Sequence, residues 1–192
     1  MVNRRSVLKI GAATAAGVLV KMPVSGRNLS PAKAHIAFHR AVFDERFAEC
    51  RGFAAELHSA GVFTSAIRGD VAGLWYDDLR AHLREDRLPV AGLTDRAALF
   101  CLEELARDVN MRVVFRVDHT IELDGLAQHG AAAEASIVSA TRRLPKEPHF
   151  GRAMAERFSR LDSRELRDAA AQKRTGPFAA KNKTVLVSWV IA

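Results

Sequence analysis

Apolar residues in this chain follow two kinds of spacing. Mostly apolar runs of strand length cover residues 36–43, 62–67, 88–93, 111–117 and 184–191. Apolar residues three and four positions apart predict helices over residues 45–60 and 71–83, and a third helix that follows Thr94 or Asp95. Strands that alternate with helices at this interval are typical of an α/β fold, in which helices cover both faces of a mostly parallel sheet.

Small and polar residues mark the ends of these segments. Gly61 follows the first helix, where glycine commonly ends a helix. Asp70 precedes the second helix, and Thr94 or Asp95 precedes the third, so these side chains can cap backbone N–H groups of the first turn. Asp118 with His119 is predicted to close the strand that begins at Met111.

Beyond His119 the pattern is weaker, and residues 121–130 are predicted to form a loop or a short irregular element. Residues 184–191 are almost entirely apolar, which predicts a strand inside the sheet with both faces covered. The expected fold is a single α/β domain with a mostly parallel, twisted sheet of about five strands and helices on both faces, similar to a Rossmann fold but without its dinucleotide fingerprint. Further helices are predicted over residues 131–144, 150–161 and 163–173.

The N-terminal residues have the layout of an export signal. Residues 3–9 read Asn-Arg-Arg-Ser-Val-Leu-Lys and precede an apolar stretch over residues 10–20. At about 11 residues this stretch is too short to span a bilayer, which needs roughly 20. Ala32-Lys33-Ala34 then provides the small residues that signal peptidase cuts after.

Residues 3–9 resemble the signal motif of exported bacterial proteins that use the twin-arginine (Tat) pathway, with Arg4 and Arg5 as the arginine pair. Val7 departs from the motif, because phenylalanine is commonest there. The resemblance implies that the Tat translocase carries the chain to the periplasm or the medium, with a signal over 1–34, cleavage after Ala34 and a mature domain over 35–192. Retention of the signal as a membrane anchor is the alternative; no transmembrane helix is expected in the mature chain.

Charge is distributed unevenly along the chain. The whole sequence carries a net charge of +7, but residues 1–34 hold six of its 29 basic residues and no acidic one. The mature chain is therefore nearly neutral, and a nucleic acid is not an expected partner. Residues 35–140 are net acidic and residues 141–192 net basic, so the two parts either attract each other within the fold or present a basic surface to an anionic partner.

A ligand site is expected where the parallel strands end, because ligands of open parallel sheets bind beyond the carboxyl ends of the strands. Polar residues follow each predicted strand there. The candidate ligand-binding residues are Asp44, Arg46, Arg68, Asp70, Thr94 and Asp95. The candidate catalytic residues are Asp118 and His119. The carboxylate of Asp118 would raise the pKa of the His119 imidazole and so suit it to proton transfer.

These residues leave three functions open. The first is a periplasmic accessory or binding protein that holds a small polar or anionic ligand, or an exported partner protein. The second is a hydrolase or lyase that uses His119 with Asp44, Asp70 or Asp118, with or without Mg²⁺ or Ca²⁺ held by the acids. The third is a non-catalytic subunit of an exported redox complex. Helix capping alone also explains Asp44, Asp70 and Asp95.

The sequence carries no cofactor motif: GxSxG, HExxH, P-loop, dinucleotide and CxxCH patterns are all missing, so no cofactor and no metal site are predicted. The chain has two cysteines, Cys50 and Cys101. An exported protein can keep a disulfide, so they could pair or remain two buried thiols.

Overall fold

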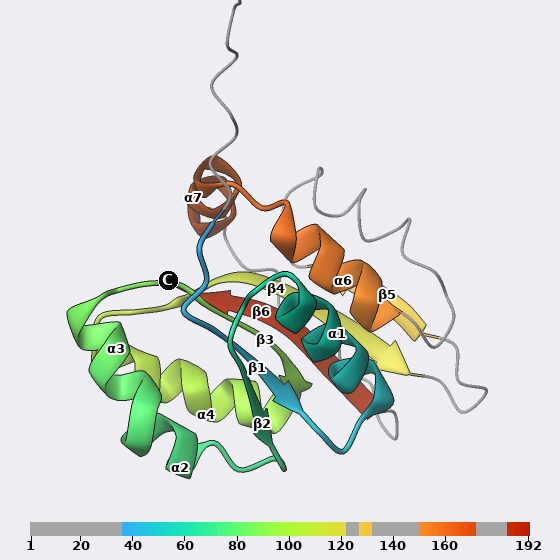
Figure 1. Ribbon diagram of the computed structural model, residues 1–192, viewed down its shortest axis with the longest axis horizontal. Helices are drawn as coiled ribbons and strands as arrows, with labels where there is room; N and C mark the ends of the chain where they lie inside the picture. Colours follow the sequence, from blue (N-terminus) through green and yellow to red (C-terminus); the bar gives the residue numbers. More distant parts are fainter. Residues whose placement is uncertain (1–35, 122–126, 132–149, 172–183) are drawn as a thin grey trace, which may run out of the picture. The chain divides into compact units, whose positions relative to one another are not determined.

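Strands from distant parts of the chain form one mixed sheet (Figure 1). The computed structural model describes residues 36–121, 127–131, 150–171 and 184–192. All of them belong to one compact unit that extends from Lys33 to Ala192. The strands are β1 (Arg40–Asp44), β2 (Thr64–Ile67), β3 (Val90–Asp95), β4 (Val113–Ile121), β5 (Ala127–Ala131) and β6 (Thr184–Ile191).

The strand order is β2-β1-β3-β6-β4-β5. β1 pairs in parallel with β2 and β3, whereas β6 is antiparallel to both of its neighbours, β3 and β4. β5 is antiparallel to β4. Hence β1, β2, β3 and β4 all point in one direction, and their carboxyl ends lie at one edge of the sheet, which we call the carboxyl edge.

Helices cover both faces of this sheet. On one face, α1 and α6 are in contact with each other and share a core with Ala41 of β1. On the other face, the run from α2 to α3 and the helix α4 enclose Val42 and Trp189. The helical segments are α1 (Ala48–Ser59), α2 (Ala72–Leu74), the π-helical η1 (Trp75–Leu79), α3 (Arg80–Glu85), α4 (Arg96–Arg107), α6 (Phe150–Ser159) and α7 (Ser163–Ala171).

A glycine allows the close approach of α1 and α6. A Cβ atom at Gly151 would lie 2.0 Å from the backbone oxygen of Glu49, so no other residue fits there without moving a helix. The Gly151 N–H donates to the Glu49 carboxylate at 3.0 Å, which ties the start of α6 to the start of α1. The two helices thus form one layer over the sheet.

The structure confirms the fold class predicted from the hydrophobic pattern. It is an α/β fold with an open sheet and helices on both faces. β6 has the predicted bounds and lies inside the sheet, with Leu186 and Val190 in one core and Val187 and Trp189 in the other. Its antiparallel direction was not predicted. Gly61 follows α1 with φ = 86°, as a helix-ending glycine should.

Two predictions near His119 are wrong. β4 continues through Asp118 and His119 to Ile121, so these residues are part of a strand and do not close it. Residues 127–130, predicted as a loop or a short irregular element, form β5 together with Ala131 and pair with β4. Ala131 ends β5 and so does not begin the helix predicted over 131–144; the rest of that predicted helix lies outside the described residues.

None of the helices within the described ranges is long and apolar enough to cross a membrane.

Candidate functional site

Arg46 joins two of the predicted site residues at the carboxyl edge. Its Nη2 lies 2.5 Å from Asp44 Oδ2 and 2.5 Å from Asp95 Oδ2, and its Nε donates to Asp44 Oδ1 at 2.9 Å. Asp44 ends β1 and Asp95 ends the neighbouring β3, so adjacent parallel strands bring both carboxylates to one guanidinium. Hydrogen bonds to Asp44 and then Asp95 raise the pKa of Arg46, which keeps it cationic.

Asp44, Arg46 and Asp95 form a structural clamp between the ends of β1 and β3. The Asp44 side chain is fully buried, whereas the Arg46 side chain is 44% exposed. Asp44 Oδ1 also accepts from the Arg46 backbone N–H at 3.1 Å. Asp95 Oδ1 caps α4 by accepting from the Ala98 N–H at 2.8 Å, as predicted. Both carboxylates therefore have strong partners already, which suits stability better than proton transfer.

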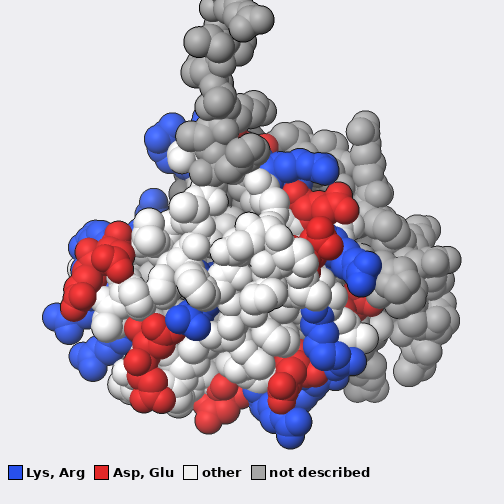
Figure 2. All heavy atoms as spheres, viewed as in Figure 1, with Lys and Arg blue, Asp and Glu red and all other residues white. Residues whose placement is uncertain are grey.

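The remaining ligand-binding candidates do not join this clamp. Arg68 forms an exposed ion pair with Glu45. Asp70 accepts from the Ala72 N–H at 2.8 Å and so caps α2. Thr94 is fully buried, and its hydroxyl accepts from the indole N–H of Trp189 at 3.0 Å. Figure 2 shows acidic and basic side chains interleaved along the lower border of the molecule, where β1 and β2 end.

The predicted catalytic pair is separated by the sheet itself. Asp118 and His119 are consecutive in β4, and consecutive strand residues point to opposite faces. Asp118 contacts Arg116 and Arg96, at 2.9 Å and 3.3 Å. A carboxylate on one face cannot orient an imidazole on the other, so the predicted pairing of Asp118 with His119 is wrong.

His119 lies in the core on the face covered by α6. Its side chain is fully buried, and its Nε2 lies 2.8 Å from the Ser188 hydroxyl. Its ring lies 4.6 Å from that of Phe150. Arg46 binds Asp44 and Asp95, and Asp70 accepts from the backbone N–H of Ala72, so these three acids are engaged elsewhere.

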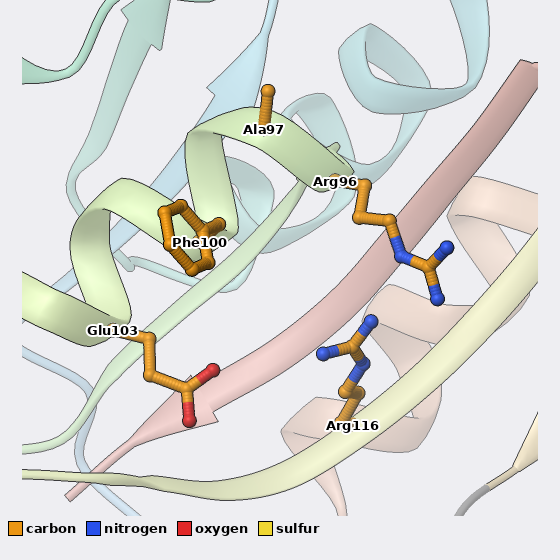
Figure 3. Close-up of a pocket in the computed structure, with 5 residues that line it drawn as sticks. All are labelled: Arg96, Ala97, Phe100, Glu103 and Arg116. Carbon is orange, nitrogen blue, oxygen red and sulfur yellow. The ribbon is translucent and has the colours of Figure 1, made fainter. Parts of the chain in front are cut away.

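A hollow of about 470 Å³ lies beside Asp118. Arg96, Ala97, Phe100 and Glu103 of α4 line it on one side, and Arg116 of β4 lines it on the other (Figure 3). The guanidinium groups of Arg96 and Arg116 point toward each other, and Phe100 is 62% exposed. The hollow thus combines two cations, the carboxylate of Glu103 and an accessible aromatic ring.

The sequence-based site did not include these lining residues. Arg96 directly follows the predicted cap Asp95, and Arg116 lies two residues before Asp118 on the same strand face. The sequence therefore places Arg96 and Arg116 close to two of the candidate residues, Asp95 and Asp118. Their convergence depends on β6, because β3 and β4 pair with opposite edges of that strand.

Comparison with known proteins assigns neither a family nor a function to the chain. No protein-family model matches the chain, and no curated protein or solved structure is significantly similar to it. Function must be inferred from the chain's own residues.

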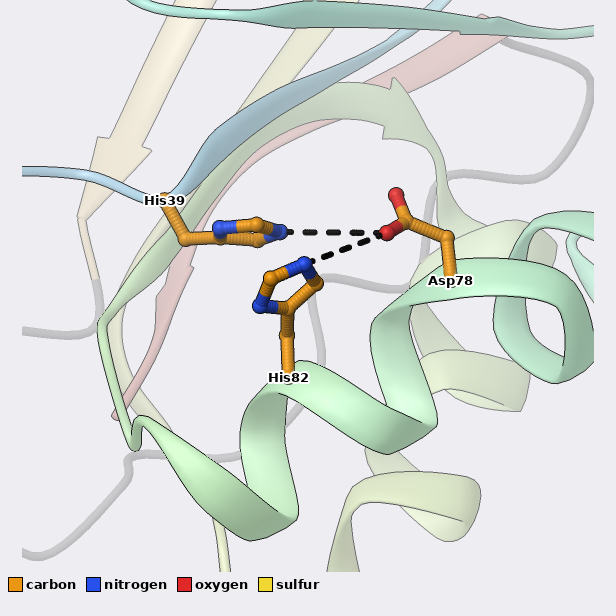
Figure 4. A group of neighbouring side chains, drawn as sticks. All are labelled: His39, Asp78 and His82. Carbon is orange, nitrogen blue, oxygen red and sulfur yellow. Dashed lines mark ion pairs between the residues drawn. The ribbon is translucent and has the colours of Figure 1, made fainter.

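A second group of polar side chains lies at the opposite edge of the sheet, next to the start of β1. It consists of His39, Asp78 and His82 (Figure 4). The sequence analysis missed this group, although Asp78, His82 and Asp86 recur at four-residue intervals and so share one helical face. His39 joins them only through the fold.

The two cysteines do not pair. Both thiols are free: Cys50 is buried in α1 and Cys101 is exposed on α4, and these helices cover opposite faces of the sheet. Burial raises the pKa of the Cys50 thiol strongly, so it behaves as an apolar core group. Of the two possibilities that the sequence left open, the disulfide is not formed; both thiols are free, but only Cys50 is buried.

Proposed function

We propose that the chain is an exported, non-catalytic protein that binds a small anionic ligand in the hollow between β4 and α4; α4 begins at Arg96, next to the carboxyl end of β3. The observation that carries this proposal is the convergence of Arg96 and Arg116 beside the exposed ring of Phe100. Binding is favoured over catalysis because Asp44, Asp95 and Asp118 are each engaged by arginine and His119 lies in the core.

The chemistry of the hollow favours an organic carboxylate. A guanidinium presents N–H donors in a planar fork that matches the two oxygens of a carboxylate. An aromatic ring next to the arginines offers apolar contact to the rest of the ligand. Asp118 contacts Arg116 Nε at 2.9 Å and Arg96 Nη2 at 3.3 Å, so both guanidinium groups are oriented before a ligand arrives. We therefore infer that the ligand is a carboxylate with an apolar or aromatic part.

Titration calorimetry of the full chain with benzoate and acetate tests this proposal. Benzoate is expected to bind more tightly than acetate, and Arg96→Gln is expected to weaken benzoate binding about tenfold, because a hydrogen bond between charged groups contributes about 1.5–3 kcal/mol. Arg112→Gln is the matched control, since Arg112 is exposed on the same part of the chain but does not line the hollow.

A second variant separates the two parts of the hollow. Phe100→Ser should weaken benzoate binding and leave acetate binding unchanged, because only benzoate contacts the ring. Circular dichroism and thermal unfolding must show that each variant is folded. Equal benzoate affinity in wild type, Arg96→Gln and Phe100→Ser would rule out the hollow as the ligand site.

We further propose that Arg4 and Arg5 direct export of the folded chain by the twin-arginine pathway, to the periplasm or the medium. Arg4→Lys combined with Arg5→Lys keeps the charge but removes the guanidinium groups. The precursor is expected to remain in the cytoplasm in a bacterial host with a twin-arginine translocase, as measured by cell fractionation and immunoblotting. Arg27→Lys is the control and should be exported normally. Export of the double variant at the wild-type level would contradict this assignment.

A further inference from the structure

His39, Asp78 and His82 form a compact set of metal-ligating groups away from the carboxyl edge. One ligand atom from each residue lies within 4.8 Å of the other two. Asp78 Oδ1 lies 3.6 Å from His82 Nε2 and 4.0 Å from His39 Nε2 (Figure 4). Two ligands of a tetrahedral zinc ion with bonds of about 2.05 Å lie about 3.3 Å apart. The distance from Asp78 Oδ1 would need to shorten by about 0.3 Å to His82 Nε2 and by about 0.7 Å to His39 Nε2 to reach that spacing.

The fold supports the orientation of His82. Its Nδ1 lies 2.8 Å from Asp86 Oδ2, one helical turn further along. A carboxylate at this nitrogen accepts its proton and leaves the lone pair of Nε2 directed at Asp78. This arrangement of carboxylate, histidine and metal is the usual outer shell of zinc-binding histidines.

His39 supplies an observation that is independent of the cluster's geometry. Its side chain is only 12% exposed, and its Nε2 is buried without a hydrogen-bond partner. Leaving a buried polar atom unsatisfied typically costs about 1–3 kcal/mol. Burial, together with the neighbouring His82 and Arg40, lowers the pKa of His39, so its ring is neutral near pH 7 and its nitrogen can act as a ligand.

Arg40 determines which kind of metal fits. Its Nη2 lies 2.7 Å from Asp78 Oδ2, and its Nη1 donates to the Ser65 hydroxyl at 2.6 Å. It therefore holds the carboxylate by one oxygen, leaves Oδ1 facing the histidines, and offsets the charge of Asp78. A site with two imidazoles and one charge-balanced carboxylate disfavours Mg²⁺ and Ca²⁺, which need several oxygen ligands, and favours borderline transition metals.

We propose that His39 Nε2, His82 Nε2 and Asp78 Oδ1 bind a divalent transition-metal ion of the Zn²⁺ type. The His82 side chain is 40% exposed, which leaves a solvent-facing fourth position for water or an external ligand. This site is independent of the anion hollow, and either could exist without the other.

The test uses the full chain after removal of metals with EDTA. Titration with Zn²⁺ is expected to show about one tight site per chain, and Co²⁺ should give the intense visible absorption of a tetrahedral site. His82→Ala should weaken Zn²⁺ binding at least about a hundredfold, and Asp86→Asn about tenfold to a hundredfold, since outer-shell partners typically contribute that much. His58→Ala, an exposed histidine in the last turn of α1, is the control and should bind as wild type does.

His82 is half-exposed, so His82→Ala should fold even if a change at His39 does not; circular dichroism verifies this. Zinc binding in His82→Ala at the wild-type affinity would overturn the site. So would an equal loss in His58→Ala, or displacement of Zn²⁺ from wild type by millimolar Mg²⁺, because each outcome indicates nonspecific binding.

Discussion

Asp44→Asn is expected to lower the free energy of unfolding by about 3 kcal/mol. Removing one partner of a buried ion pair typically costs 3–5 kcal/mol, and we expect the lower end because Arg46 is 44% exposed. The amide keeps the size of the side chain, but its NH₂ group cannot accept the hydrogen bonds that Arg46 donates to Asp44 Oδ1 and Oδ2. The clamp between β1 and β3 would thereby lose its central acceptor.

Urea denaturation followed by circular dichroism measures this effect. Glu45→Gln is the matched control, because Glu45 is the adjacent residue and pairs with Arg68 on the surface. Exposed ion pairs contribute about 0–1 kcal/mol, so this variant should be within 1 kcal/mol of wild type. If Asp44→Asn and Glu45→Gln unfolded at the same midpoint urea concentration, the buried clamp would not stabilise the fold.

Gly92→Ala is expected to cost about 3 kcal/mol through overpacking in the centre of the sheet. Gly92 of β3 is the cross-strand partner of Trp189 of β6. A Cβ atom at position 92 would lie 2.2 Å from Cζ2 and 2.4 Å from Cε2 of the Trp189 ring. Trp189 is fully buried and its indole N–H donates to Thr94, so the ring has no room to withdraw. Extra atoms in a well-packed core typically cost about 1–3 kcal/mol.

A double-mutant cycle identifies the cause. Trp189→Leu shortens the opposing side chain, so Gly92→Ala should cost at least about 1 kcal/mol less in that background than in wild type. Gly73→Ala is the control: Gly73 lies in α2 with open space around its Cβ position, and alanine there should be neutral or stabilising by up to about 1 kcal/mol. Strictly additive effects of Gly92→Ala and Trp189→Leu would show that the two residues do not clash.

The sequence predicted those parts of the fold that depend on local pattern. The caps at Asp70 and Asp95 and the apolar run of β6 follow from residues close together in the chain, and each is found as predicted. The direction of β6 could not be predicted, because both of its faces are apolar and its neighbours β3 and β4 are far away in sequence. A strand that is apolar on both faces carries no signal for parallel or antiparallel pairing.

The end of β4 was misplaced for a related reason. Asp118 and His119 are polar, and polar residues usually mark the end of a strand, but here partners from elsewhere satisfy both side chains. Arg96 and Arg116 engage Asp118, and Ser188 of β6 engages His119. No local pattern indicates such partners, so the prediction ended the strand too early.

The sequence predicted that Asp44 and Asp95 would lie at one edge of the sheet, but it predicted neither their shared partner Arg46 nor the hollow lined by Arg96 and Arg116. Parallel strands bring Asp44 and Asp95 to one edge, as the topology rule for such sheets suggests. A carboxylate at this edge can act on a ligand only if no cation of the protein already binds it. The conformation of the Arg46 side chain, which pairs with both Asp44 and Asp95, cannot be read from the sequence. The sequence analysis missed the group of His39, Asp78 and His82 because it also depends on tertiary contacts. Asp78, His82 and Asp86 have helical spacing in the sequence, but only the packing of that helix beside β1 brings His39 to them.

Nuclear magnetic resonance offers the most direct test that Arg96 and Arg116 form a ligand site. The side-chain Nε–H signals of the arginines and the backbone N–H of Phe100 would be followed in the ¹⁵N-labelled full chain during titration with benzoate. We predict that the signals of Arg96, Arg116 and Phe100 shift together along one saturable curve while that of Arg112 stays constant. Unchanged signals at Arg96 and Arg116, or equal shifts at Arg112, would contradict the proposed function.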